Sequence, residues 1–189
     1  MKQKILVKKI NKNIHTPLFL PKGDWVDLRS AKTVRFKAPQ AGTLKTRIVN
    51  GQEEKYRNVN FDLQLVPLGV AMKLPDGYEA MVIARSSLPI GFGVMLANSA
   101  GLIDGKTTKD SIGYNGPDDE WKAPLIALRD TTITENERIC QFKVQLSQKA
   151  TIWQKIKWLF TSGFEIVEVD ELPNKTNRGG FGAGTKDIK

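Results

Sequence analysis

The segment LPDGYEAMVIARSSLP, residues 74–89, contains a turn, an apolar strand and a polar end in direct succession. Pro75, Asp76 and Gly77 are turn-forming residues. The apolar run after them favours a strand, which ends where Arg85 is followed by two serines. An arginine next to two hydroxyl groups can bind an oxyanion, although the same pattern also fits a surface arginine before a helix start.

The same unit, a short apolar or alternating run between Gly, Pro, Asp and Asn residues, recurs along the chain. The runs are KILVKKI (4–10), TVRFKA (33–38), FDLQLVPLGVAM (61–72), YEAMVIA (78–84), GVMLANSAG (93–101), APLIALRD (123–130), RICQFKVQL (138–146) and FEIVEV (164–169). Runs this short and this regularly spaced indicate an all-β protein, a sandwich or barrel, rather than alternating strands and helices.

One segment has a helical pattern instead. In ATIWQKIKWLF (150–160), Ile152, Ile156, Leu159 and Phe160 recur at helical spacing. We therefore expect a helical insertion over about residues 150–162. Its apolar stripe favours a short helix docked on the core over a helix that binds a membrane surface or a partner protein.

Two polar segments are predicted to be loops. VNGQEEKYRNVN (49–60) is expected to be exposed, and GKTTKDSIG (105–113) separates apolar strands. Long loops in compact domains are often functional or mobile.

Composition excludes several kinds of site. The chain has 189 residues, 40% of them hydrophobic, which is enough for a sizeable core. The single cysteine, Cys140, and single histidine, His15, cannot supply a zinc site or a disulfide framework, and His15 is a poor candidate for a catalytic triad. The net charge of +9 favours an anionic partner, but no basic helix with interleaved aromatic residues suggests nucleic acid. Without a signal peptide or an apolar membrane span, a cytoplasmic location is expected.

Several polar residues at strand ends could carry chemistry. Asn98 and Asp104 lie at the ends of an apolar run, Tyr114 precedes an Asn-Gly-Pro turn, and Gln141 lies within a strand. Taken singly, each fits a structural role at least as well: Asp104 as a turn residue and Tyr114 as a cap on the sandwich. The glycine-rich end, NKTNRGGFGAGTKDIK (174–189), has the composition of a disordered tail, yet Phe181 stands between glycines that could expose backbone amides to an anion.

The order of these features carries more information than any one of them. Five segments in sequence resemble the five motifs of the trimeric dUTPase family, the deoxyuridine triphosphate nucleotidohydrolases, over about residues 16–186. They are GDWVDLRSA (23–31), LPDG…ARSS (74–87), LANSAGLID…YNG (96–116), NERICQ (136–141) and RGGFGAG (178–184).

The resemblance implies a distorted jelly-roll-like β domain over residues 1–173, a flexible active-site arm over 174–189, and a homotrimer whose sites lie between subunits. The arm of one subunit is expected to close over a site built by others. The implied reaction hydrolyses dUTP to dUMP and pyrophosphate with Mg²⁺, by attack of water on the α-phosphorus. It would lower dUTP and supply dUMP for dTMP synthesis, with no membrane or stable nucleic-acid partner.

The resemblance also assigns residues. Asp104 would orient the attacking water, Asp27 would hold Mg²⁺ through water, Tyr114 would exclude a ribose 2′-hydroxyl, and Phe181 would cover the base. Implied substrate contacts come from Arg85, Ser86, Ser87, Asn98, Gly101, Ile103, Tyr114, Gln141, Arg178, Gly180, Phe181 and Gly182.

The third motif departs from the family pattern, because nine residues separate Asp104 from Tyr114 where two are usual. Either the hairpin is extended and returns Tyr114 to its place, or Tyr114 does not have the family role. The related dCTP deaminases are a rival assignment, but their catalytic glutamate would fall near Ala127. A nucleotide-binding regulatory protein of the same fold is the other alternative.

Overall fold

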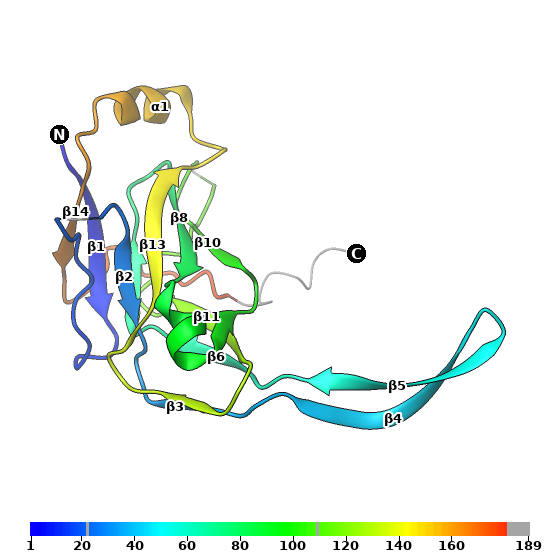
Figure 1. The fold of residues 1–189 in the computed structure, drawn as a ribbon. Coiled ribbons are helices and arrows are strands. Elements are labelled where there is room, and N and C mark those ends of the chain that lie inside the picture. The colour runs from blue at the N-terminus through cyan, green and yellow to red at the C-terminus, as the bar shows by residue number, and fades with distance from the viewer. Residues whose placement is uncertain (22, 109, 181–189) are drawn as a thin grey trace.

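The computed structural model describes residues 1–21, 23–108 and 110–180, and these residues form mostly β-strands (Figure 1). The strands are β1 (Gln3–Lys9), β2 (Val26–Arg29), β3 (Val34–Phe36), β4 (Gln40–Val49), β5 (Gln52–Asn60), β6 (Leu63–Pro67), β7 (Val70–Lys73), β8 (Tyr78–Ala84), β9 (Val94–Leu96), β10 (Ala100–Asp104), β11 (Lys122–Ala127), β12 (Thr131–Ile133), β13 (Arg138–Leu146) and β14 (Phe164–Glu168). The described residues also contain a π-helical turn, η1 (Leu88–Phe92), and one α-helix, α1 (Ile152–Leu159). The predicted all-β fold with a short helical insertion is confirmed.

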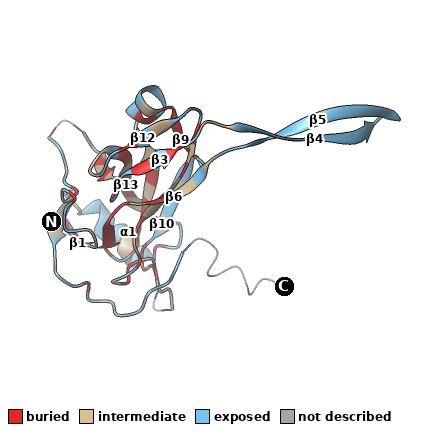
Figure 2. Ribbon diagram, turned by 90° about the horizontal axis from the view of Figure 1, so that it is seen from below, coloured by how far each residue is buried: buried red, intermediate tan, exposed pale blue. Residues whose placement is uncertain are grey.

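The pair β12-β3 and three larger sheets build the body. Their strand orders are β14-β1-β7, β10-β8-β13-β2 and β6-β11-β9, and the only parallel pair among the described strands joins β1 to β14. Tyr78, Trp121 and Phe142 are fully buried between the sheets, and the buried residues concentrate in the body (Figure 2). The alternating apolar runs of the sequence form this core because every second side chain of a strand points inward.

β13 lies between β8 and β2 and has a β-bulge between Arg138 and Cys140. The extra residue interrupts the alternation, so that Ile139 and Cys140 are both buried. The bulge explains why this strand lacks a regular amphipathic pattern.

The prediction of a loop over residues 49–60 is wrong. Residues 40–60 form an antiparallel hairpin, β4 and β5, that projects far from the body (Figures 1 and 2). Asn50 and Gly51 connect the strands with φ values of 51° and 78°, as a tight hairpin turn requires. The Asn-Gly pair in the sequence is typical of a hairpin turn. Because neither face of the hairpin meets the core, its strands do not alternate between apolar and polar residues, and the sequence did not predict them.

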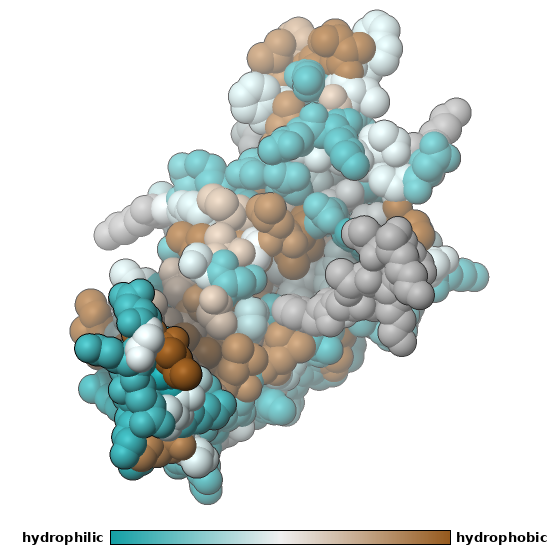
Figure 3. Space-filling view, turned by 90° about the vertical axis from the view of Figure 1, so that its right-hand side faces the viewer, coloured by the Kyte–Doolittle hydropathy of each residue, from teal (hydrophilic) through white to brown (hydrophobic). Residues whose placement is uncertain are grey.

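The helix occurs where it was predicted, but its docking on the core is wrong. Thr151 and Gln154 form a capping box that starts α1, and no residue of α1 is buried. Gln154 faces the body: its amide donates to the Thr107 carbonyl, and its side chain lies against Gly77. The apolar stripe is exposed at the top of the molecule (Figures 1 and 3). The spacing of apolar residues predicted the stripe, but it did not show which face of the helix would contact the body.

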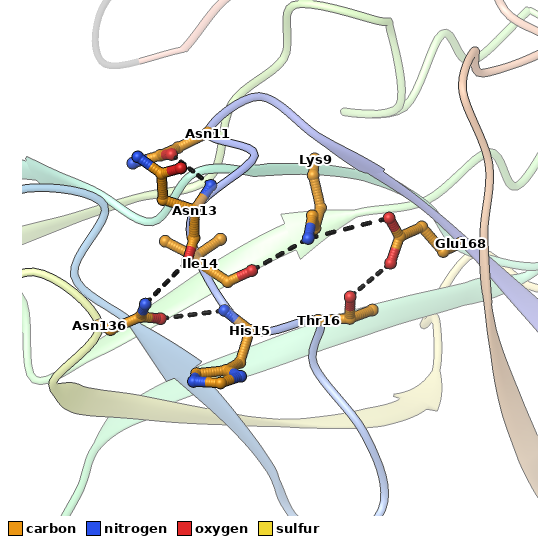
Figure 4. Close-up of polar contacts among 8 residues, drawn as sticks. All are labelled: Lys9, Asn11, Asn13, Ile14, His15, Thr16, Asn136 and Glu168. Carbon is orange, nitrogen blue, oxygen red and sulfur yellow. Dashed lines mark hydrogen bonds and ion pairs between the residues drawn. The ribbon is translucent and has the colours of Figure 1, made fainter.

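Polar contacts fix the chain after β1 (Figure 4). Lys9 donates to the Ile14 carbonyl, and Asn136 accepts from the His15 backbone amide and donates to the Asn13 carbonyl. Thr16 donates to Glu168. In the part of the chain that the structure describes, no helix is long and apolar enough to span a membrane.

Candidate active site

The predicted site residues form two groups at opposite ends of β8. Asp104 pairs with Glu79 near the start of that strand, whereas Arg85 follows its last residue, Ala84. The two ends are about 20 Å apart at about 3.3 Å per residue. A single chain therefore does not bring Asp104 to Arg85.

The first group surrounds Asp27 on β2. Arg85 forms an ion pair with one carboxylate oxygen of Asp27, and Arg138 Nη1 lies 3.3 Å from the other. Gln141 is opposite Asp27 in the β2–β13 register, and Ser86 and Ser87 are exposed beside Arg85. Arg138 was not among the predicted site residues, although it stands in the fourth motif.

Electrostatics make this group a suitable anion site. Partial burial and the nearby charge of Arg138 lower the pKa values of Arg85 and Arg29 from their ordinary value. Burial is the larger cause of these pKa shifts and the charge of Arg138 the second, and a bound anion would offset both. Exposed serine hydroxyl groups next to crowded arginines are suited to bind phosphate.

The β9–β10 connection carries Asn98 at its turn, where Ser99 has a φ of 60°. Gly101 pairs with Val82 and Ile103 with Ala80, so this hairpin lies along β8 from the Arg85 end to the Asp104 end. Asn98 is exposed, and Gly101 and Ile103 are half-buried. The three residues are thus accessible along one strand that leads to Asp104.

The second group is centred on Asp104. Arg178 Nη1 donates to Asp104 Oδ2 at 2.5 Å, and both side chains are about half exposed. They line a pocket of about 680 Å³, which Glu79, Thr107 and Lys149 also border. A cavity of this size can accommodate a nucleotide-sized ligand.

The insertion after Asp104 is a loop, as predicted, and it returns Tyr114 to Asp104. The Tyr114 backbone amide donates to the Asp104 carbonyl at 2.7 Å, and its hydroxyl donates to the Glu120 carbonyl at 2.8 Å. Burial, with Asp119 and Glu120 nearby, raises the Tyr114 pKa above its ordinary value. The geometry agrees with the extended-hairpin alternative.

Asp119 holds the start of the C-terminal arm, and sequence reasoning did not single it out. Its carboxylate is buried, with a residue exposure of 2%, and accepts from the backbone amides of Gly116 (2.8 Å), Arg178 (3.0 Å) and Gly179 (3.0 Å). Within the run PDDE nothing distinguishes it from its neighbours. Its importance comes from distant residues that fold back onto it.

The described part of the arm, residues 174–180, lies against its own chain. Asn174 donates to Asn115 at 2.5 Å, Asn177 bonds to Asp118, and Gly180 lies so close to Tyr114 that an added Cβ would come within 3.2 Å of the ring. That the arm closes over a site built by other subunits stays a prediction. Phe181 and Gly182 lie outside the described residues.

Two other nucleophile candidates play no part here. The His15 backbone amide donates to Asn136, and the His15 side chain is exposed (Figure 4). Cys140 is buried, and burial raises the pKa of its thiol to about 12, so it remains protonated at neutral pH.

Two known proteins of similar sequence are deoxyuridine 5′-triphosphate nucleotidohydrolases. The chain is 38% identical over 168 residues to the SPbeta prophage-derived deoxyuridine 5′-triphosphate nucleotidohydrolase YosS of Bacillus subtilis, covering 88% of each. It is 36% identical over 126 residues to the deoxyuridine 5′-triphosphate nucleotidohydrolase of Hydrogenobaculum sp., covering 65% of this chain and 71% of the relative. No family model matches.

Solved structures agree in fold. The dUTPase of Streptococcus mutans superposes with a TM-score of 0.52 at 21% identity, over 74% of this chain and 94% of that one. A Staphylococcus bacteriophage 80alpha dUTPase variant with dUpNHpp gives a TM-score of 0.53 at 16% identity, over 94% and 96%. With the YosS similarity over most of both chains, these findings show that the protein belongs to the deoxyuridine 5′-triphosphate nucleotidohydrolase (dUTPase) family.

Proposed function

We propose that the protein hydrolyses dUTP to dUMP and pyrophosphate, and that Asp104 orients the attacking water. The observation that carries this mechanism is the pocket lined by Asp104 and Arg178, with Tyr114 bonded through its backbone amide to the Asp104 carbonyl. A carboxylate beside an arginine can hold a water molecule while the arginine neutralises phosphate charge. Ordered water attack needs no nucleophilic side chain, in keeping with the buried, protonated Cys140.

The Asp27 group would bind the triphosphate. Arg85 and Arg138 supply positive charge, Ser86 and Ser87 supply hydroxyl donors, and Gln141 adds an amide. When the triphosphate arrives, Arg85 would exchange part of its contact with Asp27 for phosphate oxygens. Charge neutralisation and positioning are the main requirements of phosphoryl chemistry.

The donors near Asp27 fit a magnesium ion that enters with its substrate. Within residues 1–21, 23–108 and 110–180, no three His, Cys, Asp or Glu side chains are placed to hold a metal by themselves. Mg²⁺ usually binds one or two carboxylates and completes its shell with water and phosphate oxygens, so a single carboxylate suffices. Asp27 would hold the ion through water, and the ion would supply further charge neutralisation on the triphosphate.

The β9–β10 hairpin and the arm would select the nucleoside. Backbone groups near Asn98, Gly101 and Ile103 would read uracil. The Tyr114 ring would pack under the deoxyribose and leave no space for a 2′-hydroxyl. Gly180, Phe181 and Gly182 would close over the base and phosphates.

A homotrimer of jelly-roll-like subunits would complete the site. The separation of Asp104 from Arg85 along β8 supports a site to which two chains contribute. The outer face of the β6-β11-β9 sheet is apolar, and register places its side chains side by side: Leu63 opposite Ile126, Leu65 opposite Pro124, and Met95 opposite Ile126. Exposed apolar faces of this kind mark subunit interfaces.

The test is a product assay on the purified protein with dUTP, dCTP, dTTP and UTP. We expect magnesium-dependent release of pyrophosphate from dUTP, with UTP and dCTP as poor substrates. Asp104→Asn should lower turnover by about 10³-fold or more while nucleotide binding persists, because the ordered water is lost. Near-normal turnover of this variant would refute the role of Asp104.

The same assay distinguishes the two alternatives. Release of ammonia from dCTP would indicate a deaminase; Ala127, at the position of the deaminase glutamate, is fully buried and apolar. Tight dUTP binding without turnover would indicate a regulatory nucleotide-binding protein.

A further inference from the structure

The hairpin of residues 40–60, here called the ribbon, has two different faces. Register places Lys45 opposite Tyr56 and Arg47 opposite Glu54 on one face. Arg47 is bonded to Glu54 at 2.7 Å and lies over the Tyr56 ring, 5.1 Å from its centroid. Arg47 of this face is thus held by partners within the ribbon.

The opposite face exposes apolar side chains. Leu44 and Ile48 lie on it across from Arg57 and Glu53, and Val59 lies on it near the body. Their exposed fractions are 50% for Leu44, 78% for Ile48 and 56% for Val59. An isolated two-stranded hairpin is marginally stable in water, so an exposed apolar face on it indicates a surface that another molecule covers.

This face leads into the apolar sheet of the body. The exposed apolar side chains Val59, Phe61, Leu63 and Leu65 follow one another at every second position from β5 into β6. Figure 3 looks along the ribbon and shows apolar side chains on the ribbon and on the body beside it. The apolar side chains of the ribbon face, which are interspersed with charged side chains, therefore lead into the outer face of β6-β11-β9.

We propose that the ribbon is an intersubunit arm whose Leu44–Ile48–Val59 face packs on a second copy of this chain. The inference rests on the proposed trimer and extends its interface. The ribbon spans about 30 Å at about 3.3 Å per residue, long enough to cross much of a neighbouring subunit. In a closed symmetric oligomer, each ribbon can occupy an equivalent place on the next subunit.

Nucleic acid fits this surface less well. Residues 40–60 contain four basic and two acidic residues, and one basic residue, Arg47, is already paired with Glu54. A nucleic-acid surface would instead present unpaired cations without aliphatic side chains between them.

The first test compares association of the intact protein with that of two variants. One replaces residues 44–57 with Asn-Gly, and the other carries Leu44→Ser and Ile48→Ser. By analytical ultracentrifugation over a dilution series, we expect the intact chain to form trimers and both variants to associate at least tenfold more weakly. The matched control is Lys45→Ser with Val49→Ser, on the face that carries Arg47. This variant should associate like the intact chain.

The second test locates the contact. Because Cys140 is buried, a benzophenone maleimide can be attached selectively to Ile48→Cys. Irradiation should crosslink this variant to a second copy, with little crosslinking from Lys45→Cys. Intact trimers in both ribbon variants, without crosslinks from Ile48→Cys, would overturn the ribbon proposal alone. A monomeric intact chain would overturn the proposed trimer as well. If that monomer still hydrolysed dUTP, the proposed activity would stand and the site shared between two chains would be refuted.

Discussion

Asp119 shows how one side chain can connect segments that are distant in sequence. Its carboxylate accepts backbone amides from residue 116 and from the arm at residues 178 and 179. Losing an acceptor for buried donors costs about 1–3 kcal/mol, which corresponds to about a 5- to 150-fold change in an equilibrium. We therefore expect Asp119→Ala to lower kcat/KM for dUTP within that range, because the arm is no longer held beside Asp104.

A truncated chain separates positioning from general damage. In a protein lacking residues 174–189, Asp119→Ala should cause no further loss of kcat/KM, since there is no arm to position. Asp118→Ala is the matched comparison: it removes an exposed bond to Asn177 of the arm, so the loss of kcat/KM should be smaller than for the buried Asp119. Equal losses from Asp119→Ala in intact and truncated chains would argue against a positioning role.

Tyr114 should make the thermal stability of the protein depend on pH in the alkaline range. Its pKa is raised by burial and by Asp119 and Glu120, so the folded state favours the neutral phenol. The resulting stabilisation is present below the unfolded pKa of about 10 and is lost as pH rises through the higher folded value. Between pH 9 and 11, the Tm of the natural protein should therefore fall more steeply than that of Tyr114→Phe. Parallel curves would show that Tyr114 ionises as readily in the folded state as in the unfolded one.

At the scale of elements, α1 depends on its cap and on one contact with the body. Gln154→Ala removes half of the capping box and the bond to Thr107, at a cost of about 1 kcal/mol. Because no residue of α1 is buried, the loss should be local. Hydrogen exchange should accelerate over residues 150–160 and 105–108 with little change in global Tm, and Lys155→Ala should change neither. A large fall in Tm would mean that α1 stabilises the whole body.

The elements also show what the sequence could and could not predict. β8 and β13 have the predicted bounds because their residues alternate toward a core. The ribbon was missed because it meets no core in its own chain, and the orientation of α1 was missed because its apolar face is turned outward. The extended-hairpin alternative predicted Asp104 and Tyr114 as neighbours. Whether they meet depends on the path of the loop between them, which the sequence pattern does not specify. The arm contact with Asp119 involves backbone amides, which leave no pattern in the sequence.

At the scale of the whole molecule, the two groups of site residues predict how defective subunits should complement each other. The Asp104 and Arg85 groups lie at opposite ends of β8, so each proposed site takes Asp104 from one chain and Arg85 from another. Mixed refolding of Asp104→Asn with Arg85→Ala should then restore activity, with about one quarter of sites intact in random trimers. Each variant refolded alone is the control. An inactive mixture would mean that one chain supplies both groups.

The arm gives the opposite expectation. Arg178 bonds to Asp104 of its own chain, and Asp119 of that chain holds the arm, so we expect the arm and Asp104 of one site to come from the same subunit. When Asp104→Asn is mixed with a chain lacking residues 174–189, every remaining Asp104 lacks its own arm. Activity measured as pyrophosphate release should therefore stay at the level of the separate variants. Recovery in this mixture, together with recovery in the Asp104→Asn and Arg85→Ala mixture, would show instead that the arm crosses to a neighbouring subunit when the trimer forms.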